Sequence, residues 1–137
     1  MSRMAEESVE RRGRQRFLAT RWGQVCFWVL IEGEKLELND LSLEGFAFPA
    51  SSPPPTGQAV SFVLQRAGVP DEIRGQAQVV NYLHDVSGGQ AGCRFVSFEG
   101  DGAERLHDWL VAHVIANATV RITEKDARAI VAGGSLI

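Results

Sequence analysis

The sequence predicts a mainly β fold, a six-stranded antiparallel β-barrel followed by C-terminal α-helices. Six short runs of apolar residues, most of them rich in β-branched or aromatic side chains, are separated by links rich in Gly, Pro and Ser, as in a closed antiparallel barrel. Helical spacing of apolar residues begins only after Asp101. The 137 residues, 45% hydrophobic and 23% charged, are enough for one domain with its own core.

The first predicted strand, Val25 to Ile31, is aromatic and β-branched and ends at a turn over residues 32–35. The second runs from Leu36 to Asp40. Apolar residues move from even to odd positions along it, which predicts a β-bulge or corner at Asn39–Asp40. Bulges often redirect functional side chains, so we expect this corner to carry part of a site.

Four further strands complete the predicted barrel. A stiff, proline-rich connector follows the first of these four, and turns that contain glycine separate the others. The four strands cover residues 45–48, 60–65, 73–83 and 91–98, and the connector covers residues 49–57.

Two helices are predicted after the barrel. Asp101–Glu104 is close to a capping box, and a helix over residues 101–116 follows it. Its apolar stripe includes Trp109, which we interpret as a core residue that covers the barrel rather than a ligand-stacking one. A second capped helix spans Thr123–Val131. It is too short to be stable alone, so its apolar face packs either on the barrel or on another chain.

Charge is unevenly distributed. The net charge is −3, yet five arginines crowd into one short stretch: Arg11, Arg12, Arg14, Arg16 and Arg21. A nucleic-acid-binding domain is normally basic overall, whereas local basicity suits a receptor for a small dianion. A single-stranded nucleic-acid site would also need aromatic residues beside the arginines, and here the aromatic residues cluster in predicted core strands.

Other function classes have weak support. The longest apolar run is too short for a transmembrane helix, and no secretory signal is visible, so we expect a cytoplasmic protein. Cys26 and Cys93 lie in separate strand-like runs, which indicates core residues rather than a disulfide or a metal pair. No catalytic motif or metal-ligand spacing appears, so we expect neither an enzyme nor a bound cofactor.

Two short motifs stand in a characteristic order and spacing. Arg12 and Arg16 frame an RxxxR motif in a polar segment that is typical of a mobile arm, and Asp40–Gly45 forms a DxSxxG motif at the end of a half-buried strand. Alone, the second motif is typical of simple turn chemistry, with Asp and Ser bonding backbone amides. Together the two motifs resemble the signature of the PilZ domain family, and Gly92–Phe95 resembles its closing strand.

The resemblance covers about Glu10 to Ala116 and implies a receptor for the bacterial second messenger cyclic di-GMP. The chain then divides into a tail (1–9), a PilZ domain (10–116) and a C-terminal helical extension (117–137), and the domain consists of an arm (10–23), a barrel (24–99) and a helix (101–116). Many family members place an aromatic residue and a proline between the motif arginines. This chain has Arg14 and Gln15 there, which concerns the conformation of the arm rather than its charge.

The resemblance assigns the ligand to Arg11, Arg12, Arg16, Asp40, Ser42 and Gly45. Arginine suits both the phosphates and the O6/N7 edge of guanine, and Asp40 suits the guanine N1 and N2 donors. The Ser42 hydroxyl is expected to donate to a phosphate or guanine acceptor, and Gly45 to adopt a positive φ or to leave room for the ligand. An arginine at position 11 is associated in the family with capture of a stacked ligand dimer, which implies two molecules per chain.

A domain of this kind without an output module must signal through a downstream protein partner, and the C-terminal helix is a candidate for oligomerisation. The alternative function is a PilZ-fold adaptor for protein–protein interaction that does not bind nucleotide.

Overall fold

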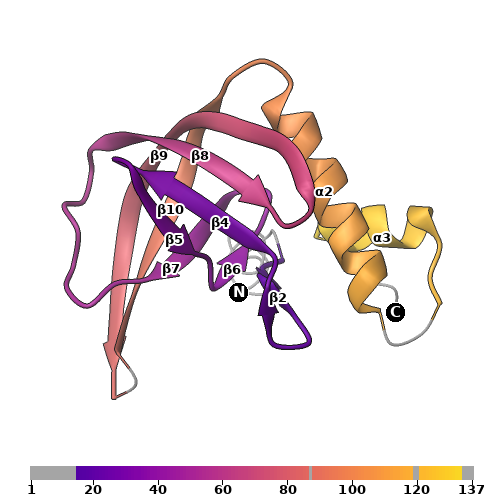
Figure 1. Cartoon of the computed structure of the whole chain (residues 1–137), viewed down its shortest axis with the longest axis horizontal. Coiled ribbons are helices and arrows are strands. Elements are labelled where there is room, and N and C mark those ends of the chain that lie inside the picture. The colour runs from indigo at the N-terminus through magenta and orange to yellow at the C-terminus, as the bar shows by residue number, and fades with distance from the viewer. Residues whose placement is uncertain (1–14, 87, 119–120, 134–137) are drawn as a thin grey trace, which may run out of the picture.

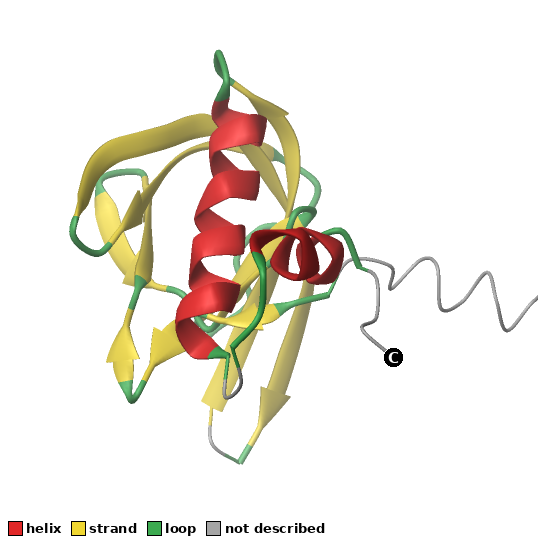
Figure 2. Cartoon of the chain, turned by 90° about the vertical axis from the view of Figure 1, so that its right-hand side faces the viewer, coloured by secondary structure: helices red, strands yellow, loops and turns green. Residues whose placement is uncertain are grey.

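The computed structural model describes residues 15–86, 88–118 and 121–133. Most of the described chain lies in one strongly curved antiparallel sheet, and two helices follow at the C-terminal end (Figures 1 and 2). The fold is therefore mainly β with C-terminal helices, as the sequence predicts. Among the described helices, none is long and apolar enough to span a bilayer.

The main sheet has eight described strands in the order β1-β6-β7-β10-β9-β8-β4-β5, and a separate hairpin pairs β2 with β3. β9 and β10 form a long hairpin that projects beyond the other strands (Figure 1). The strands are β1 Phe17–Leu18, β2 Thr20–Arg21, β3 Gln24–Val25, β4 Phe27–Ile31, β5 Glu34–Glu37, β6 Asp40–Leu41, β7 Gly45–Pro49, β8 Ala59–Arg66, β9 Val69–Asp85 and β10 Gly88–Phe98.

The predicted number of six strands is wrong, because the main sheet alone contains eight among the described residues. The additional strands β1, β2, β3 and β6 have two residues each. Strands of this length carry no detectable hydrophobic period, so only their pairing partners identify them. The part of the arm between residues 15 and 23 is accordingly held by sheet and hairpin pairing, although the sequence indicated a mobile segment.

The predicted closed barrel is a curled half-barrel instead (Figure 1). Its outer strands, β1 and β5, do not pair with each other in the described part of the chain. The predicted corner lies between β5 and β6. The Leu38 amide donates to the Phe27 carbonyl of β4, whereas the Asn39 amide donates to the Ala47 carbonyl of β7. One bent segment thus joins opposite ends of the sheet and places Asp40 directly after the bend.

The core lies between the concave face of the sheet and helix α2, Gly102–Asn117, which packs across it (Figure 2). Phe27, Phe46 and Phe62 are almost completely buried in the sheet. Trp109 of α2 is 4% exposed, and its ring stacks on Phe27 with centroids 6.4 Å apart. The interpretation of Trp109 as a core residue is confirmed. Burial of such a side chain contributes roughly 2–3 kcal/mol to folding.

The N-terminus of α2 departs from the expected capping box. Asp101 is the N-cap, but its side chain makes no cap hydrogen bond, and its φ of −93° and ψ of 24° are not the extended conformation that capping favours. The Asp101 carboxylate instead pairs with Arg105, 3.1 Å away, one turn into the helix. The second helix, α3 (Glu124–Val131), does have the predicted capping box, formed by Thr123 and Asp126.

The apolar face of α3 packs on α2 within the same chain. Ala127 and Val131 of this face are fully buried and belong to the main core. The structure therefore places this helix on its own domain, and its role in oligomerisation stays a prediction.

Both cysteines are free thiols. Cys93 is buried in β10, and its burial raises the pKa of the thiol to about 11, so it is a protonated core residue at neutral pH. Cys26 is half-buried. No cluster of His, Cys, Asp and Glu suited to a metal ion occurs among the described residues.

Candidate ligand-binding site

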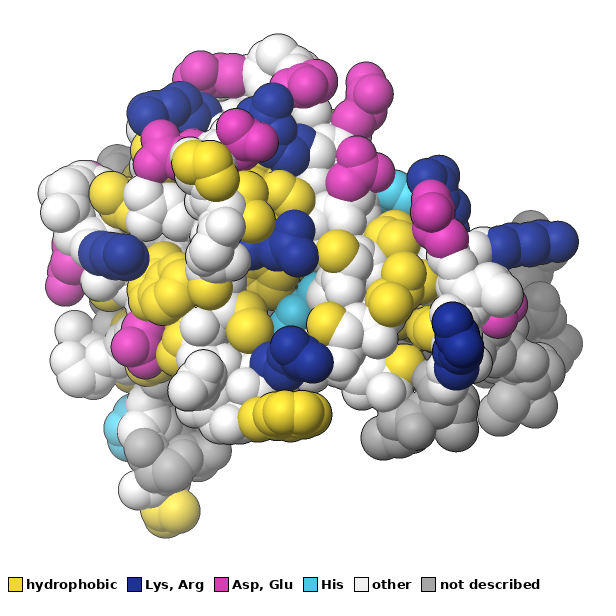
Figure 3. Space-filling view, turned by 45° about the vertical axis from the view of Figure 1, so that its right-hand side comes forward, with side chains coloured by type: hydrophobic (Ala, Val, Ile, Leu, Met, Phe, Trp, Pro, Cys, Tyr) yellow, Lys and Arg dark blue, Asp and Glu magenta, His cyan; other side chains and the backbone are white. Residues whose placement is uncertain are grey.

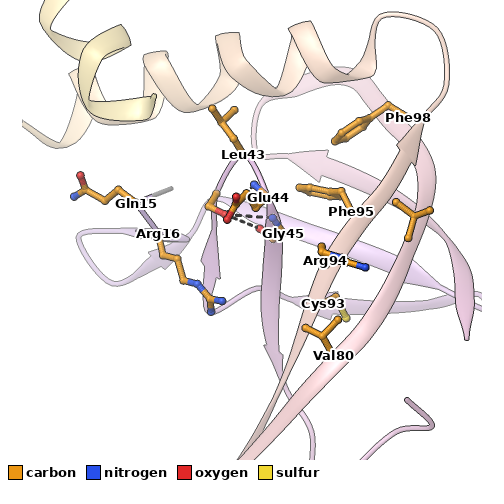
Figure 4. A pocket seen from close by; sticks show the side chains of 12 residues that line it. Gln15, Arg16, Leu43, Glu44, Gly45, Val80, Cys93, Arg94, Phe95 and Phe98 are labelled. Carbon is orange, nitrogen blue, oxygen red and sulfur yellow. Dashed lines mark hydrogen bonds between the residues drawn. The ribbon is translucent and has the colours of Figure 1, made fainter. Parts of the chain in front are cut away.

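A cavity of about 980 Å³ opens where the described end of the arm, the turn over residues 42–45 and the hairpin of β9 and β10 meet (Figure 4). This volume is in the range of sites for small organic ligands. The cavity is lined by Gln15, Arg16, Ser42, Leu43, Glu44, Gly45, Val80, Cys93, Arg94, Phe95, Val96 and Phe98.

Arg16 and Asp40 come together beside this cavity. Arg16 directly precedes β1, and Asp40 lies in the adjacent strand β6, where it is paired with Leu18 of β1. Arg16 Nη1 lies 3.8 Å from Asp40 Oδ1, with the arginine half-exposed and the carboxylate 18% exposed. The pairing of β1 with β6 thus joins the two sequence motifs, and their sequence spacing alone did not specify this contact.

Asp40 is not fully satisfied in the structure. Its Oδ1 is buried and accepts no hydrogen bond from the described residues, because the guanidinium of Arg16 is too distant to donate one. Burial raises the pKa of this carboxyl, and the charge of Arg16 opposes the rise. An ionised Asp40 at neutral pH therefore costs the unliganded protein stability. A buried acceptor without a donor is suited to receive N–H groups from a ligand.

Ser42 has a different surrounding. Its side chain is 3% exposed, and its Oγ accepts hydrogen bonds from the amides of Glu44 (3.1 Å) and Gly45 (3.2 Å). The hydroxyl donates to the Gly45 carbonyl over 3.4 Å. These bonds are the turn chemistry that the motif predicts when it stands alone, and Figure 4 marks hydrogen bonds within the turn. Ser42 shapes the turn; its contact with a ligand remains a prediction.

Gly45 departs from one of the two forms of its predicted role, the positive φ. Its φ is not among the positive values of the described residues, so no left-handed conformation requires glycine here. A Cβ at this position would lie 1.9 Å from the Cys93 carbonyl oxygen of β10. Glycine therefore allows β10 to approach β7, where Gly45 pairs with Arg94. The close approach in the structure is to the neighbouring strand, and the other form of the predicted role, room for a ligand, stays a prediction.

Strand β10 adds residues that the sequence did not assign to the site. Arg94 lies opposite Gly45 in the sheet, and its Nη2 donates to Gln78 Oε1 over 3.2 Å. Phe95 and Phe98 form an apolar wall, and in Figure 4 they lie on the other side of the turn from Arg16. The sequence showed this segment as a closing strand, but only its pairing with β7 reveals that Arg94 reaches the motif.

Arg11 and Arg12 lie outside the described residues. Of the six predicted ligand residues, the structure places Arg16, Asp40, Ser42 and Gly45 together at one edge of the sheet. Arg16, Ser42 and Gly45 line the cavity, and Asp40 faces Arg16.

The sequence of residues 24–112 matches the PilZ domain family over more than half of the chain. Together with the curved sheet and the joined motifs, this match shows that the chain belongs to the PilZ domain family. No curated protein has detectable sequence similarity to the chain.

Among solved structures, the chain is similar to the inhibitor of motility MotI/DgrA of Bacillus subtilis, with a TM-score of 0.63 and 14% sequence identity. The likeness covers 79% of this chain and 53% of that protein, so this chain spans about half the length of its neighbour. At this identity the likeness concerns the fold alone. An uncharacterised Legionella protein also matches, with a TM-score of 0.48 and 13% identity over 67% of this chain and 85% of that one.

Proposed function

We propose that this PilZ domain is a receptor for cyclic di-GMP that closes its arginine-rich arm over the ligand and signals to a partner protein. One observation carries the proposal. Among the described residues, Asp40 Oδ1 is a buried acceptor without a hydrogen bond, and it lies 3.8 Å from Arg16, which lines a cavity of about 980 Å³. A carboxylate beside a guanidinium matches the donor and acceptor edges of a guanine that carries a phosphate.

The chemistry of the ligand assigns a task to each side chain. Asp40 accepts hydrogen bonds from guanine N1 and N2, and Arg16 donates to phosphate oxygens or to the O6/N7 edge. Phe95 and Phe98 offer an apolar wall to the flat face of a base, and Arg94 adds a second guanidinium to the cavity. Ser42 and Gly45 contribute by holding the turn and β10 in place.

The remaining arginines of the arm complete the proposed site. Ordering about five arm residues costs on the order of 5–10 kcal/mol of backbone entropy. Each charge-assisted hydrogen bond returns roughly 1.5–3 kcal/mol, so closure requires several of them at once. Arg12 and Arg16 supply these bonds, and Arg11 adds a charge that favours a stacked ligand dimer with its four phosphates.

Isothermal titration calorimetry with cyclic di-GMP, GTP and a short oligonucleotide tests the proposal. We expect saturable binding of cyclic di-GMP alone, at two molecules per chain. Arg12→Ala and Arg16→Ala should each weaken binding at least tenfold, about 1.4 kcal/mol. Arg74→Ala is the matched control, because Arg74 pairs with Glu72 on the exposed surface and does not line the cavity at the motifs.

Affinity like that of the wild type in both motif variants would contradict the proposed site. Saturation at one equivalent, at ligand concentrations at which the nucleotide dimerises, would contradict the stoichiometry only. Absence of any binding would leave the nucleotide-free adaptor as the function of the domain. Partner capture with and without cyclic di-GMP then tests whether the ligand controls the output.

A further inference from the structure

A second hollow, of about 410 Å³, lies between the β2–β3 hairpin, the end of β8 and helix α2. It shares no lining residue with the cavity at the motifs. Figure 3 shows dark blue, cyan and yellow side chains gathered around this part of the surface, between the hairpin and the helix. The lining residues are Arg21, Trp22, Gln24, Val25, Cys26, Arg66, Ala67, His113 and Ala116.

The charge of this hollow is entirely positive. Arg21 and Arg66 line it, and no Asp or Glu among the described residues does. Neither arginine forms an ion pair with any acidic residue in the described part of the chain, whereas Arg16, Arg74, Arg105 and Arg128 all do. Arg66 is also half-buried, at a position in β8 that pairs with Phe27 of β4. A partly desolvated guanidinium without a counter-ion favours binding of an anion.

Trp22 supplies an exposed aromatic surface at the same rim. Its side chain is 88% exposed, and its φ is +54°, a conformation that is uncommon for a bulky residue. The hairpin turn at Trp22–Gly23 therefore holds an indole ring in solvent at some cost. The Arg21 guanidinium lies 4.9 Å from the centroid of this ring, which leaves the opposite face of the indole free for stacking.

His113 lines the inner part of the hollow but does not add to its charge. The ring is 6% exposed, and its Nε2 donates to the Leu18 carbonyl at 2.7 Å. Burial lowers the pKa of His113, the hydrogen bond to Leu18 opposes this, and the charges of Arg66 and Arg21 lower it further. Both guanidinium groups are thus close enough to lower the pKa of the same buried ring, and both side chains line the same hollow.

We propose that this hollow is a second ligand site, which binds the phosphate of a nucleotide between Arg21 and Arg66 and stacks its base on Trp22. A volume of about 410 Å³ is within the range of small-ligand pockets. Guanidinium forks match phosphate oxygens, and base stacking on an aromatic ring contributes roughly 1–3 kcal/mol. An acidic peptide would engage the arginines but leave the free face of the indole without a planar partner.

NMR titration with adenosine 5′-monophosphate tests this site, because adenine lacks the guanine edge that Asp40 is proposed to read. The chain has three tryptophans and therefore three indole N–H signals. The signal that disappears in Trp22→Phe belongs to Trp22. The other two signals serve as internal references, because Trp109 is buried and the ring of Trp28 is covered by Lys35 at 4.8 Å. We expect a saturable shift of the Trp22 signal alone, with inorganic phosphate binding more weakly.

The variants separate the two parts of the site. Arg66→Gln should weaken binding of the mononucleotide at least fivefold, measured by the Trp22 signal. Trp22→Ala removes that signal, so its titration is followed by the backbone amide signals of Arg21 and Arg66, and the mononucleotide should lose its advantage over inorganic phosphate. Arg74→Gln is the surface control, and Arg16→Ala should leave the Trp22 titration unchanged if the two sites are distinct.

Three outcomes would overturn the proposal. One is a Trp22 signal that does not shift or that shifts without saturation at millimolar mononucleotide. Another is an unchanged titration in Arg66→Gln, since this variant retains the fold if its other indole signals keep their positions. The third is tighter binding of a glutamate-rich peptide than of the mononucleotide, which would reassign the hollow to an acidic protein segment.

Discussion

Asp40 and the turn over residues 42–45 are adjacent in one motif, yet they have opposite effects on the stability of the protein. Ser42 and Gly45 are satisfied by the fold itself, through hydrogen bonds inside the turn and through close contact with Cys93 of β10. Asp40 has a buried oxygen that no described residue supplies with a donor, and its carboxyl has a pKa that is raised by burial. The turn stabilises the free protein, whereas Asp40 is costly until a ligand supplies donors.

The largest expected effect is on the turn. Gly45→Ala places a Cβ 1.9 Å from the Cys93 carbonyl oxygen, so β7 and β10 must separate. We expect a loss of about 3 kcal/mol or more in the free energy of unfolding, and thus a fall in Tm of roughly 10 °C, measured by thermal denaturation.

Gly33→Ala is the control for this substitution. Gly33 has a φ of +81° and open space around its Cα, so alanine there costs only about 1 kcal/mol of backbone strain. Equal losses in the two variants would show that close packing against β10 is not the reason for glycine at position 45.

Asp40→Asn should have the opposite effect on stability. Because burial raises the pKa of Asp40 in the folded state, stability decreases as the pH rises from below 3.8 through the folded-state pKa, and the cost persists at neutral pH. We expect the neutral amide to increase the free energy of unfolding by up to about 1 kcal/mol at pH 7 and to weaken cyclic di-GMP at least tenfold. Denaturant titration and calorimetry measure the two effects.

This pair of outcomes distinguishes a ligand-reading residue from a structural one. If Asp40→Asn lost stability but retained affinity, Asp40 would stabilise the fold as Ser42 and Gly45 do, and it would not contact the ligand. Ser42→Ala offers the counterpart, since loss of its hydroxyl removes two acceptor contacts and should lower stability by about 1–2 kcal/mol.

The smallest expected effect concerns the strand that holds the arm beside Asp40. Leu18 pairs with Asp40, and its carbonyl accepts a hydrogen bond from His113 Nε2. The pKa of His113 is lowered chiefly by burial, with Arg66 and Arg21 as the charged neighbours. The unfolded chain therefore binds this proton first, and stability falls as the pH decreases from about 6.5 through the lower folded-state pKa.

Denaturant unfolding between pH 7.5 and 5 should show this decrease in the wild type, and His113→Gln should reduce it. We expect the decrease in the free energy of unfolding between these pH values to differ between the two proteins by about 1 kcal/mol or less. Identical pH profiles for both proteins would exclude His113 as the source. Unfolding of Arg66→Gln over the same pH range tests whether the charge of Arg66 contributes to the lowered pKa of His113.

Much of the fold followed from local pattern. Strand β4 and the long strands β8 and β9 were expected from runs of β-branched and aromatic residues, and α3 from a capping box at Thr123. Asp101 shows the limit of such signals. It has the right residue type for capping, but its backbone conformation directs it to Arg105 instead.

The sequence by itself determined the family, the order of the elements and four of the residues that meet at the site, because motif spacing and hydrophobic period are local properties. Only the tertiary structure decided that Asp40 Oδ1 has no donor among the described residues, that Gly45 makes room for β10, and that Arg94 reaches the cavity. It also decided that Arg21, Trp22 and Arg66 share a second hollow. The physical reason is that burial and strand register depend on contacts between segments far apart in the chain, which no local pattern encodes.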